Sequence, residues 1–143
     1  MIELRKITED NFRAIVNIKM PEDQRFVAPN VYSLAQAWLY PEARPFAIYN
    51  DDEPIGFIML DWDEAERELG IWRLMIALEH QGKGYGSKAV TAAIDMGRQS
   101  GKFDAVFIDC VPQNVVGLHV YKKLGFVPTG EIEDGEIVMK LDL

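Results

Sequence analysis

Hydrophobic and polar positions alternate with two different periods along this chain, and each change of period marks a new element. Alternation over residues 2–7 predicts a first strand, whereas apolar residues at helical spacing predict a helix over 9–19. Thr8 is the expected N-cap of that helix. A second helix is predicted to have Ser33 as its cap and to end at Pro41, because proline cannot continue a helix.

The middle of the chain predicts a hairpin followed by a buried strand. Apolar runs over 46–49 and 55–60 flank the turn-forming residues 50–52. The acidic stretch 61–68 indicates a solvated loop, because runs of like charge usually face water. Residues 71–76 are β-branched, aromatic or aliphatic apart from one arginine, which is typical of a mostly buried strand.

The last part of the chain predicts two helices and three strands. Small and apolar residues at helical spacing between 89 and 97 indicate the first of these helices. A continuous apolar run over 105–111 predicts a central strand. The next helix is predicted from Asn114 to Leu124, closed by Gly125 at the position after its C-cap. A final hairpin is expected around residues 134–135, an Asp-Gly pair.

The predicted order is β-α-α-β-β-β-α-β-α-β-β in a single domain spanning residues 1–143. The helix over 89–97 joins two strands of nearly continuous apolar character, which requires a right-handed parallel crossover. The other strands join by hairpins. We therefore expect a mixed α/β (α+β) fold, with a central, mostly antiparallel sheet of about seven strands and four helices on both faces.

Composition narrows the classes of function. A net charge of −8, from 23 acidic and 15 basic residues, disfavours nucleic acid and anionic membranes as partners, and it permits a cationic substrate. No apolar run is long enough to span a membrane, and no basic-then-apolar leader begins the chain. Cys110, the only cysteine, is expected to be a buried hydrophobe. We expect a cytoplasmic protein.

A glycine-rich turn lies between the strand 71–76 and the following helix. Gly82, Gly84 and Gly86 stand at every second position, so backbone N–H groups can approach an anion at the positive end of that helix. The spacing matches neither a Walker phosphate loop nor a dinucleotide-binding turn. A solvated turn before a surface helix is the alternative interpretation.

A second group of residues lies on the predicted helix over 114–124. Asn114, Leu118 and Tyr121 are separated by four and three residues, which places them on one helical face. Aromatic residues at this spacing usually pack in a core. Tyr121 is therefore either a core residue or a functional one on the evidence of spacing alone.

The two motifs together, Q-x-x-G-x-G at residue 81 and N-x-x-[AG]-x-x-x-Y-x-x-x-G-F at residue 114, resemble the GNAT superfamily of acyl-coenzyme A N-acyltransferases. The resemblance implies acetyl-CoA (coenzyme A) as cofactor, its pyrophosphate on the glycine turn, and Tyr121 as the acid that protonates the departing thiolate. It implies no metal. The cofactor-binding residues that it implies are Leu74, Met75, Ile76, Gln81, Gly82, Lys83, Gly84, Tyr85, Gly86, Ser87, Asn114 and Tyr121.

The general base is not identified by the motifs. His80 lies beside the glycine turn, and His119 lies on the fourth helix away from the face of Tyr121. A water relay to an acidic residue is the favoured alternative, because several members of the superfamily use one. The alternative from another class of function is a domain that binds coenzyme A as a sensor and catalyses no reaction.

The chain also resembles a bacterial branch of spermine/spermidine (diamine) acetyltransferases, in the segments 22–30, 32–35, 72–73, 81–86 and 130–139. This resemblance implies a small-molecule amine, a polyamine, as acceptor. Acids and aromatics would pair the charges and cover the methylenes of such an amine. Arg73 would instead favour an acceptor that carries a carboxylate. The alternative acceptors are another small amine (an amino acid or aminoglycoside) and a peptide amine. The sequence is also compatible with a homodimer. The expected acceptor residues are Glu22, Asp23, Phe26, Trp72 and Arg73, with Asn30, Tyr32, Trp38 and Glu68 as further wall residues.

Overall fold

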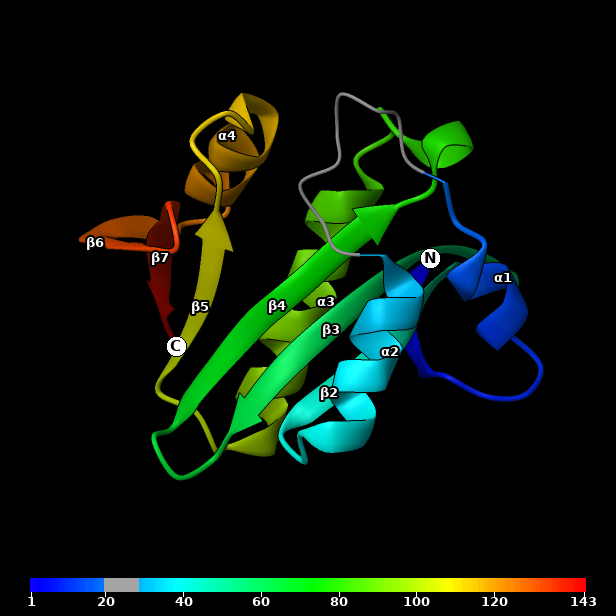
Figure 1. Ribbon diagram of the computed structural model, residues 1–143. Helices are drawn as coiled ribbons and strands as arrows, with labels where there is room; N and C mark the ends of the chain where they lie inside the picture. Colours follow the sequence, from blue (N-terminus) through cyan, green and yellow to red (C-terminus); the bar gives the residue numbers. More distant parts are fainter. Residues whose placement is uncertain (20–28) are drawn as a thin grey trace.

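The computed structural model describes residues 1–19 and 29–143 and shows one seven-stranded sheet with helices on both faces (Figure 1). The elements are β1 (Ile2–Lys6), α1 (Phe12–Val16), α2 (Asn30–Leu39), β2 (Ala43–Asn50), β3 (Glu53–Asp63), β4 (Glu68–Ile76), the 3₁₀ turn η2 (Leu78–His80), α3 (Tyr85–Ser100), β5 (Ala105–Cys110), α4 (Val115–Lys123), β6 (Val127–Glu133) and β7 (Glu136–Asp142).

The strand order is β1-β2-β3-β4-β5-β7-β6. Among the described strands, β4 and β5 pair in parallel and every other neighbouring pair is antiparallel. The parallel pair is joined by α3, as a crossover requires. The predicted mixed, mostly antiparallel sheet is therefore confirmed.

The parallel pair β4–β5 holds together over only part of its length. Glu68 to Ile71 pair with Ala105 to Ile108, and beyond these positions the two strands diverge toward their carboxyl ends (Figure 1). β4 continues to Ile76 and stays paired with β3 on its other side. Among the described residues, the β5-facing edge of β4 therefore has no strand partner after Ile71.

A bulge in β4 lies at the point of divergence. Leu60 of β3 pairs with Ile71 and its neighbour Met59 pairs with Arg73, so Trp72 has no opposite residue. Such an extra residue bends the strand and increases its local twist. The bulge therefore directs the second half of β4 away from β5 and brings the Trp72 side chain to the surface, with 36% of it exposed.

Two hydrophobic cores lie on opposite faces of the sheet. The larger core packs α3 and Tyr121 of α4 against the central strands. The smaller core packs Ile15 of α1 against the other face of β2 and β3, through Ala47, Phe57 and Met59. Figure 1 shows α2 in front of the sheet and α3 behind it. This arrangement confirms the expectation of helices on both faces.

The predicted boundaries of α4 are close to those observed, because both caps form. The Asn114 side chain accepts a hydrogen bond of 3.0 Å from the Gly117 N–H. At the other end, Gly125 has a φ of 106°. The Phe126 N–H then donates to the Tyr121 carbonyl, and the Gly125 N–H donates to the Lys122 carbonyl, which is a Schellman ending.

The first two helices differ from the sequence prediction. Asn11, not Thr8, is the N-cap of α1, because its side chain folds back onto the Thr8 N–H at 2.8 Å and the Lys6 carbonyl at 3.0 Å. Residues 9–11 therefore form a turn and the helix covers only five residues. Ser33 lies within α2, not at its cap, because the helix already begins after Pro29.

The acidic stretch 61–68 is not the solvated loop that its charge pattern indicated. β3 runs to Asp63 and β4 begins at Glu68, so only residues 64–67 form a turn. Trp62 pairs with Leu69, which is fully buried, and this packing extends the hairpin through the charged positions. The acidic residues of the two strands therefore have fixed positions on the sheet.

Candidate active site

A small cavity of about 80 Å³ lies where β4 and β5 diverge. Leu74 of β4, Asn114 before α4 and Tyr121 within α4 line it together. The structure thus brings Leu74 of the expected cofactor strand beside the motif that begins at Asn114, although 40 positions separate these two residues in sequence. Cys110 at the end of β5 lines the same cavity.

Tyr121 is buried, with 8% of its surface exposed, and its ring packs edge-on against Phe126 at 6.2 Å. Burial raises the pKa of Tyr121 above its usual range, and the neighbouring Cys110 contributes to the same shift. The phenol therefore keeps its proton throughout the neutral pH range and can donate a hydrogen bond into the cavity.

Cys110 fits its prediction as a buried residue. It is 3% exposed, and burial, followed by the charge of Glu136, raises the pKa of the thiol to about 11. A thiol that stays protonated is a poor nucleophile. Cys110 therefore contributes apolar surface and a weak donor to the cavity wall.

The glycine turn follows the carboxyl end of β4 and opens α3. Gly82 and Gly84 have φ values of 76° and 79°, which glycine adopts without strain, and no atom of the described residues lies within 4 Å of a Cβ built on either one. Gln81 ties the turn to β4 by donating to the Ile76 carbonyl at 3.0 Å. The turn therefore presents open backbone at the N-terminus of a 16-residue helix.

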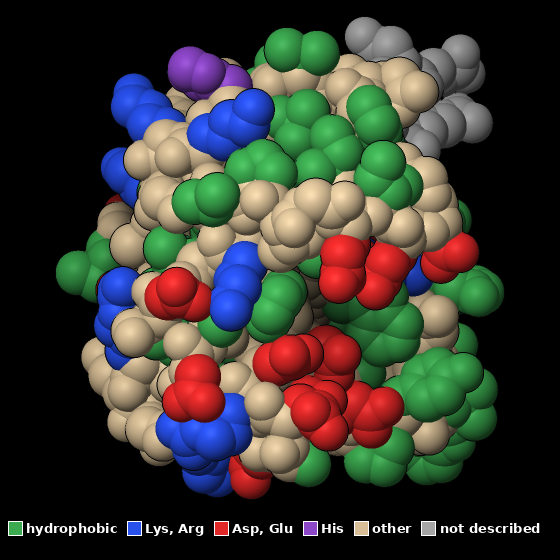
Figure 2. All heavy atoms as spheres, turned by 90° about the vertical axis from the view of Figure 1, so that its left-hand side faces the viewer, with side chains coloured by type: hydrophobic (Ala, Val, Ile, Leu, Met, Phe, Trp, Pro, Cys, Tyr) green, Lys and Arg blue, Asp and Glu red, His purple; other side chains and the backbone are tan. Residues whose placement is uncertain are grey.

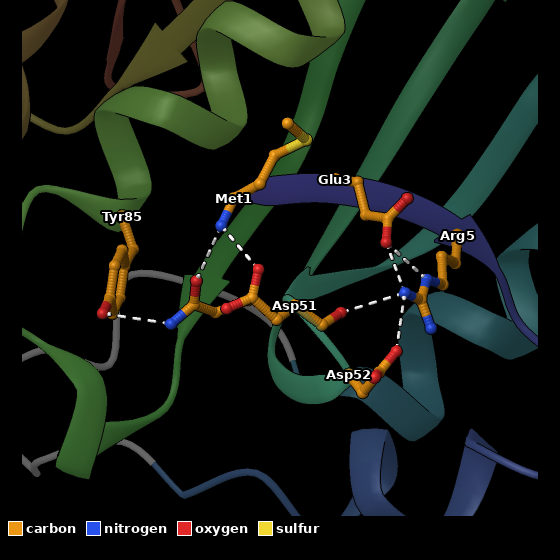
Figure 3. A network of polar contacts seen from close by, with 7 residues as sticks. Met1, Glu3, Arg5, Asp51, Asp52 and Tyr85 are labelled. Atoms are coloured by element: carbon orange, nitrogen blue, oxygen red, sulfur yellow. Dashed lines mark hydrogen bonds and ion pairs between the residues drawn. The ribbon is translucent and has the colours of Figure 1, made fainter.

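Tyr85, the first residue of α3, is held in place by a contact with the hairpin of β2 and β3. The Asn50 amide at the end of β2 donates to the Tyr85 hydroxyl at 3.2 Å (Figure 3). The Oδ1 atom of the same Asn50 side chain accepts a hydrogen bond from the α-amino group of Met1, which also pairs with the Asp51 carboxylate at 2.8 Å. The start of α3 is thus fixed relative to β1 and β2 by a chain of polar contacts.

A second and larger cavity, of about 610 Å³, lies beside the first on the sheet face that carries α2. Tyr40 and Trp72 form part of its wall, with ring centroids 6.1 Å apart. No Lys or Arg of the described chain lines it. The remaining side chains of its wall are mainly acidic: Glu42, Asp61, Asp63, Glu68, Asp109, Glu131 and Glu133.

The acidic residues gather around a hollow on the surface, as Figure 2 shows. The Oδ1 atom of Asp61 is buried, and within the described residues it has no hydrogen-bond partner. Burial raises the pKa of Asp61, and Asp63, Glu42 and Glu68 raise it further. This cavity therefore lacks a compensating positive charge of its own.

The predicted acceptor residues are only partly brought together. Glu68 and Trp72 line the acidic cavity, whereas Tyr32 and Trp38 are exposed on α2 and line neither cavity. Asn30 is 3% exposed and donates to the Ile15 carbonyl at 2.7 Å, so it anchors α2 to α1. Glu22, Asp23 and Phe26 lie outside the described residues, and their role in acceptor binding stays a prediction.

Arg73 lines the small cavity and not the acidic one. Its guanidinium donates to the Gln36 side chain of α2 at 3.1 Å and lies 5.1 Å from the Trp72 ring centroid. Burial lowers its pKa, while Tyr32 and Glu136 act in the opposite direction. The guanidinium is therefore held by α2 and leaves the acidic cavity without a competing cation.

Neither histidine lines either cavity. The His80 Nε2 atom lies 3.3 Å from the Glu53 carboxylate, at the start of β3. His119 is on α4 but is absent from the cavity walls. The structure therefore removes both from contact with the candidate site.

The sequence analysis missed six acidic residues of this cavity: Glu42, Asp61, Asp63, Asp109, Glu131 and Glu133. A signal for four of them was present. Asp61 and Asp63 are two positions apart, as are Glu131 and Glu133, and residues at that spacing share one face of a strand. Residues 61 and 63 were assigned to a loop because the strand was predicted to end at residue 60, whereas β3 runs to Asp63. Glu131 and Glu133 were assigned to the final hairpin but not to a site.

The chain matches the acetyltransferase (GNAT) family over residues 2–126. It is 26% identical to a spermine/spermidine N(1)-acetyltransferase of Bacillus subtilis, over 99% of both chains. It is 28% identical to a spermidine N(1)-acetyltransferase of Escherichia coli, over 62% of this chain and 48% of that one. The resemblance to the GNAT superfamily that the two sequence motifs indicated is therefore confirmed.

Solved structures show the same fold. Spermidine N-acetyltransferase of Vibrio cholerae, in complex with coenzyme A and spermine, superposes with a TM-score of 0.76 at 20% identity, over 99% of this chain and 94% of that one. An aminoglycoside acetyltransferase in complex with coenzyme A superposes with a TM-score of 0.80 at 21% identity, over 99% of this chain and 95% of that one.

None of the helices in the described part of the chain is long and apolar enough to cross a membrane.

Proposed function

Since this chain belongs to the acetyltransferase (GNAT) family, whose members use acetyl-CoA, we propose that it transfers the acetyl group to a primary amine of a polyamine such as spermine or spermidine. The observation that carries the choice of acceptor is the acidic cavity of about 610 Å³ beside the small cavity. Its carboxylates would pair with the ammonium groups of a polyamine, and Tyr40 and Trp72 would cover methylene groups.

The fit of coenzyme A rests on three features of this chain. The amides from Gly82 to Gly86 would hold the pyrophosphate, because they are open and lie at the start of α3. The pantetheine arm would bind as an added strand along the β5-facing edge of Leu74 to Ile76, which pairs with no other strand of the described chain. The thioester would then lie at the small cavity.

Attack by the neutral amine on the thioester carbonyl produces negative charge on oxygen and then on sulfur. A backbone N–H on the strand from Leu74 to Ile76 would stabilise the first charge. Tyr121 would act as general acid toward the second, because its buried phenol is protonated and lines the small cavity. Direct transfer needs no nucleophilic cysteine, which agrees with the protonated state of Cys110.

The choice of acceptor is tested by release of the coenzyme A thiol with spermidine, spermine, an aminoglycoside, amino acids and a lysine-containing peptide. We expect the two polyamines to give the highest kcat/KM. Turnover with amines other than polyamines would keep the enzyme class and overturn the acceptor. Tight coenzyme A binding without turnover on any amine would favour the non-catalytic sensor.

The role of the cavity is tested by the double variant Glu131→Gln/Glu133→Gln. We expect it to raise the KM for spermidine about tenfold, equivalent to roughly 1.4 kcal/mol of binding. Glu9→Gln/Asp10→Asn is the matched control, because it removes two exposed charges from a turn outside the cavity. An equal rise in KM in both variants would mean that net charge, and not the cavity, attracts the amine.

A further inference from the structure

The two cavities of the candidate site meet at one carboxylate, that of Asp109 on β5. The other residues that line both cavities are Ile71, Trp72 and Ile108, and none of these can accept a proton. Ile108 and Cys110, the neighbours of Asp109 in the strand, belong to the core that contains α3. Asp109 therefore points to the opposite face, into the acidic cavity.

The surroundings of Asp109 are acidic on one side. Glu133 of β6, Glu136 of β7 and Asp134 between them face it from the neighbouring hairpin. The cavity walls remove part of its water, and this burial together with those three charges raises its pKa to about 6. Among the described residues, no hydrogen bond or ion pair holds the carboxylate.

The charged and titratable groups on its other sides come from β3, β4, β5 and α4. Asp61 and Glu68 share the acidic cavity with Asp109. Arg73 and Tyr121 share the small cavity, together with the protonated Cys110 at the end of the same strand. Arg73 is engaged by Gln36 of α2, so its guanidinium is held from another element.

We propose that the Asp109 carboxylate accepts the proton that the acceptor ammonium loses before its nitrogen attacks the thioester. This inference rests on the proposed function, because it requires an amine in the acidic cavity. The proton passes to Asp109 directly or through one water, and Asp109 later releases it to solvent. The C–N bond forms first, with negative charge on the carbonyl oxygen, and the C–S bond then breaks as that oxygen regains its double bond to carbon. Tyr121 gives its proton to the sulfur and recovers one from the acylated nitrogen.

The position of Asp109 distinguishes it from the other acids of the cavity. Asp61 also has a raised pKa, but it lines only the acidic cavity, away from the wall shared with the small one. A carboxylate that titrates near pH 6 is ionised at neutral pH, yet it binds a proton better than an ordinary aspartate does. A base is most effective when its pKa lies close to the working pH.

The test compares Asp109→Asn with Asp63→Asn, which removes the same charge from another wall of the acidic cavity. We measure kcat and kcat/KM for spermidine between pH 5 and 9, and coenzyme A affinity by calorimetry. Asp109→Asn is expected to lower kcat by about 10²–10⁴-fold with unchanged coenzyme A affinity. It should also abolish the rise of activity through pH 6 that we expect of the wild-type enzyme.

Asp63→Asn is expected to raise the KM for spermidine but to keep the rise of activity through pH 6. Asp109→Glu is expected to recover part of the kcat and of the pH dependence that Asp109→Asn loses. A retained rise and an unchanged kcat in Asp109→Asn would overturn the role of Asp109 and leave the proposed function intact. If the wild-type enzyme acetylates other amines but not spermidine, the acceptor is wrong and the same comparison is made with those amines. Absence of turnover with every amine would overturn both.

Discussion

Tyr121 is the residue on which the chemistry of the small cavity depends. Replacement by phenylalanine removes the hydroxyl and keeps the ring that packs against Phe126. We expect Tyr121→Phe to lower kcat by about 10²–10⁴-fold, because the departing thiolate loses its proton donor. Coenzyme A affinity, measured by calorimetry, should change little, since the pyrophosphate binds elsewhere.

The same variant separates a chemical role from a packing role. Because the ring is retained, the melting temperature of Tyr121→Phe should stay close to that of the wild-type protein. An unchanged kcat at saturating substrate, with the fold intact, would reduce Tyr121 to a core residue. That outcome would agree with the alternative interpretation based on helical spacing alone.

Helix α3 ends in glycines of similar conformation, and they provide a matched pair of variants. Gly84 at its N-cap has a φ of 79°, and Gly101 at its C-cap has a φ of 68°. Within the described part of the chain, no atom lies within 4 Å of a Cβ built on either residue. Valine at either position therefore causes mainly backbone strain, which costs at least about 1–2 kcal/mol.

We expect Gly84→Val and Gly101→Val to lower the free energy of unfolding by similar amounts, measured by denaturant titration. Only Gly84→Val should lose coenzyme A affinity, because its side chain covers the amides at the start of the helix. Unchanged affinity in a folded Gly84→Val protein would place the pyrophosphate elsewhere. Equal loss of affinity in both variants would indicate that general destabilisation, and not the turn, is responsible.

Across the whole molecule, the acidic cavity should make stability depend on pH in an unusual direction. Asp61 and Asp109 have raised pKa values in the folded protein, the latter about 6, against about 3.9 for an unfolded aspartate. Their charged forms therefore oppose folding above pH 6. As pH falls from about 7 toward 4, the folded state binds protons first and this penalty is lost.

We expect the melting temperature to be higher at pH 5.5 than at pH 7.5 in a buffer of constant ionic strength. Asp109→Asn should reduce the difference, because the variant has one titrating group fewer. Spermidine at pH 7.5 should also raise the melting temperature, since a ligand that binds the folded state stabilises it. A protein that is less stable at pH 5.5 would show that other carboxylates dominate.

The sequence by itself determined the order of the elements and several of their ends. Local chemistry fixed these ends: the Asn114 side chain caps α4, and Gly125 can adopt the φ that closes it. The Asp134-Gly135 turn has φ values of 50° and 78°, as a two-residue hairpin requires. Such features involve neighbours within a few residues, so they can be read from the chain.

The glycine turn and the Asn114–Tyr121 pattern were likewise recognisable, because each is a short motif with fixed spacing. Their roles in binding coenzyme A and in protonation stay predictions. Failures of the local prediction have a tertiary cause. The Asn11 side chain binds the Lys6 carbonyl and shortens α1, and buried Leu69 extends a hairpin through acidic positions.

Only the tertiary structure decided where the acids lie. Glu42, Asp61, Asp109 and Glu133 come from segments far apart in sequence, and the strand order of the sheet brings them around one cavity. The bulge at Trp72 separates β4 from β5 and creates the small cavity beside it. A charge pattern shows how many like charges a chain carries, but long-range strand pairing determines which of them share a low-dielectric space and therefore which titrate differently.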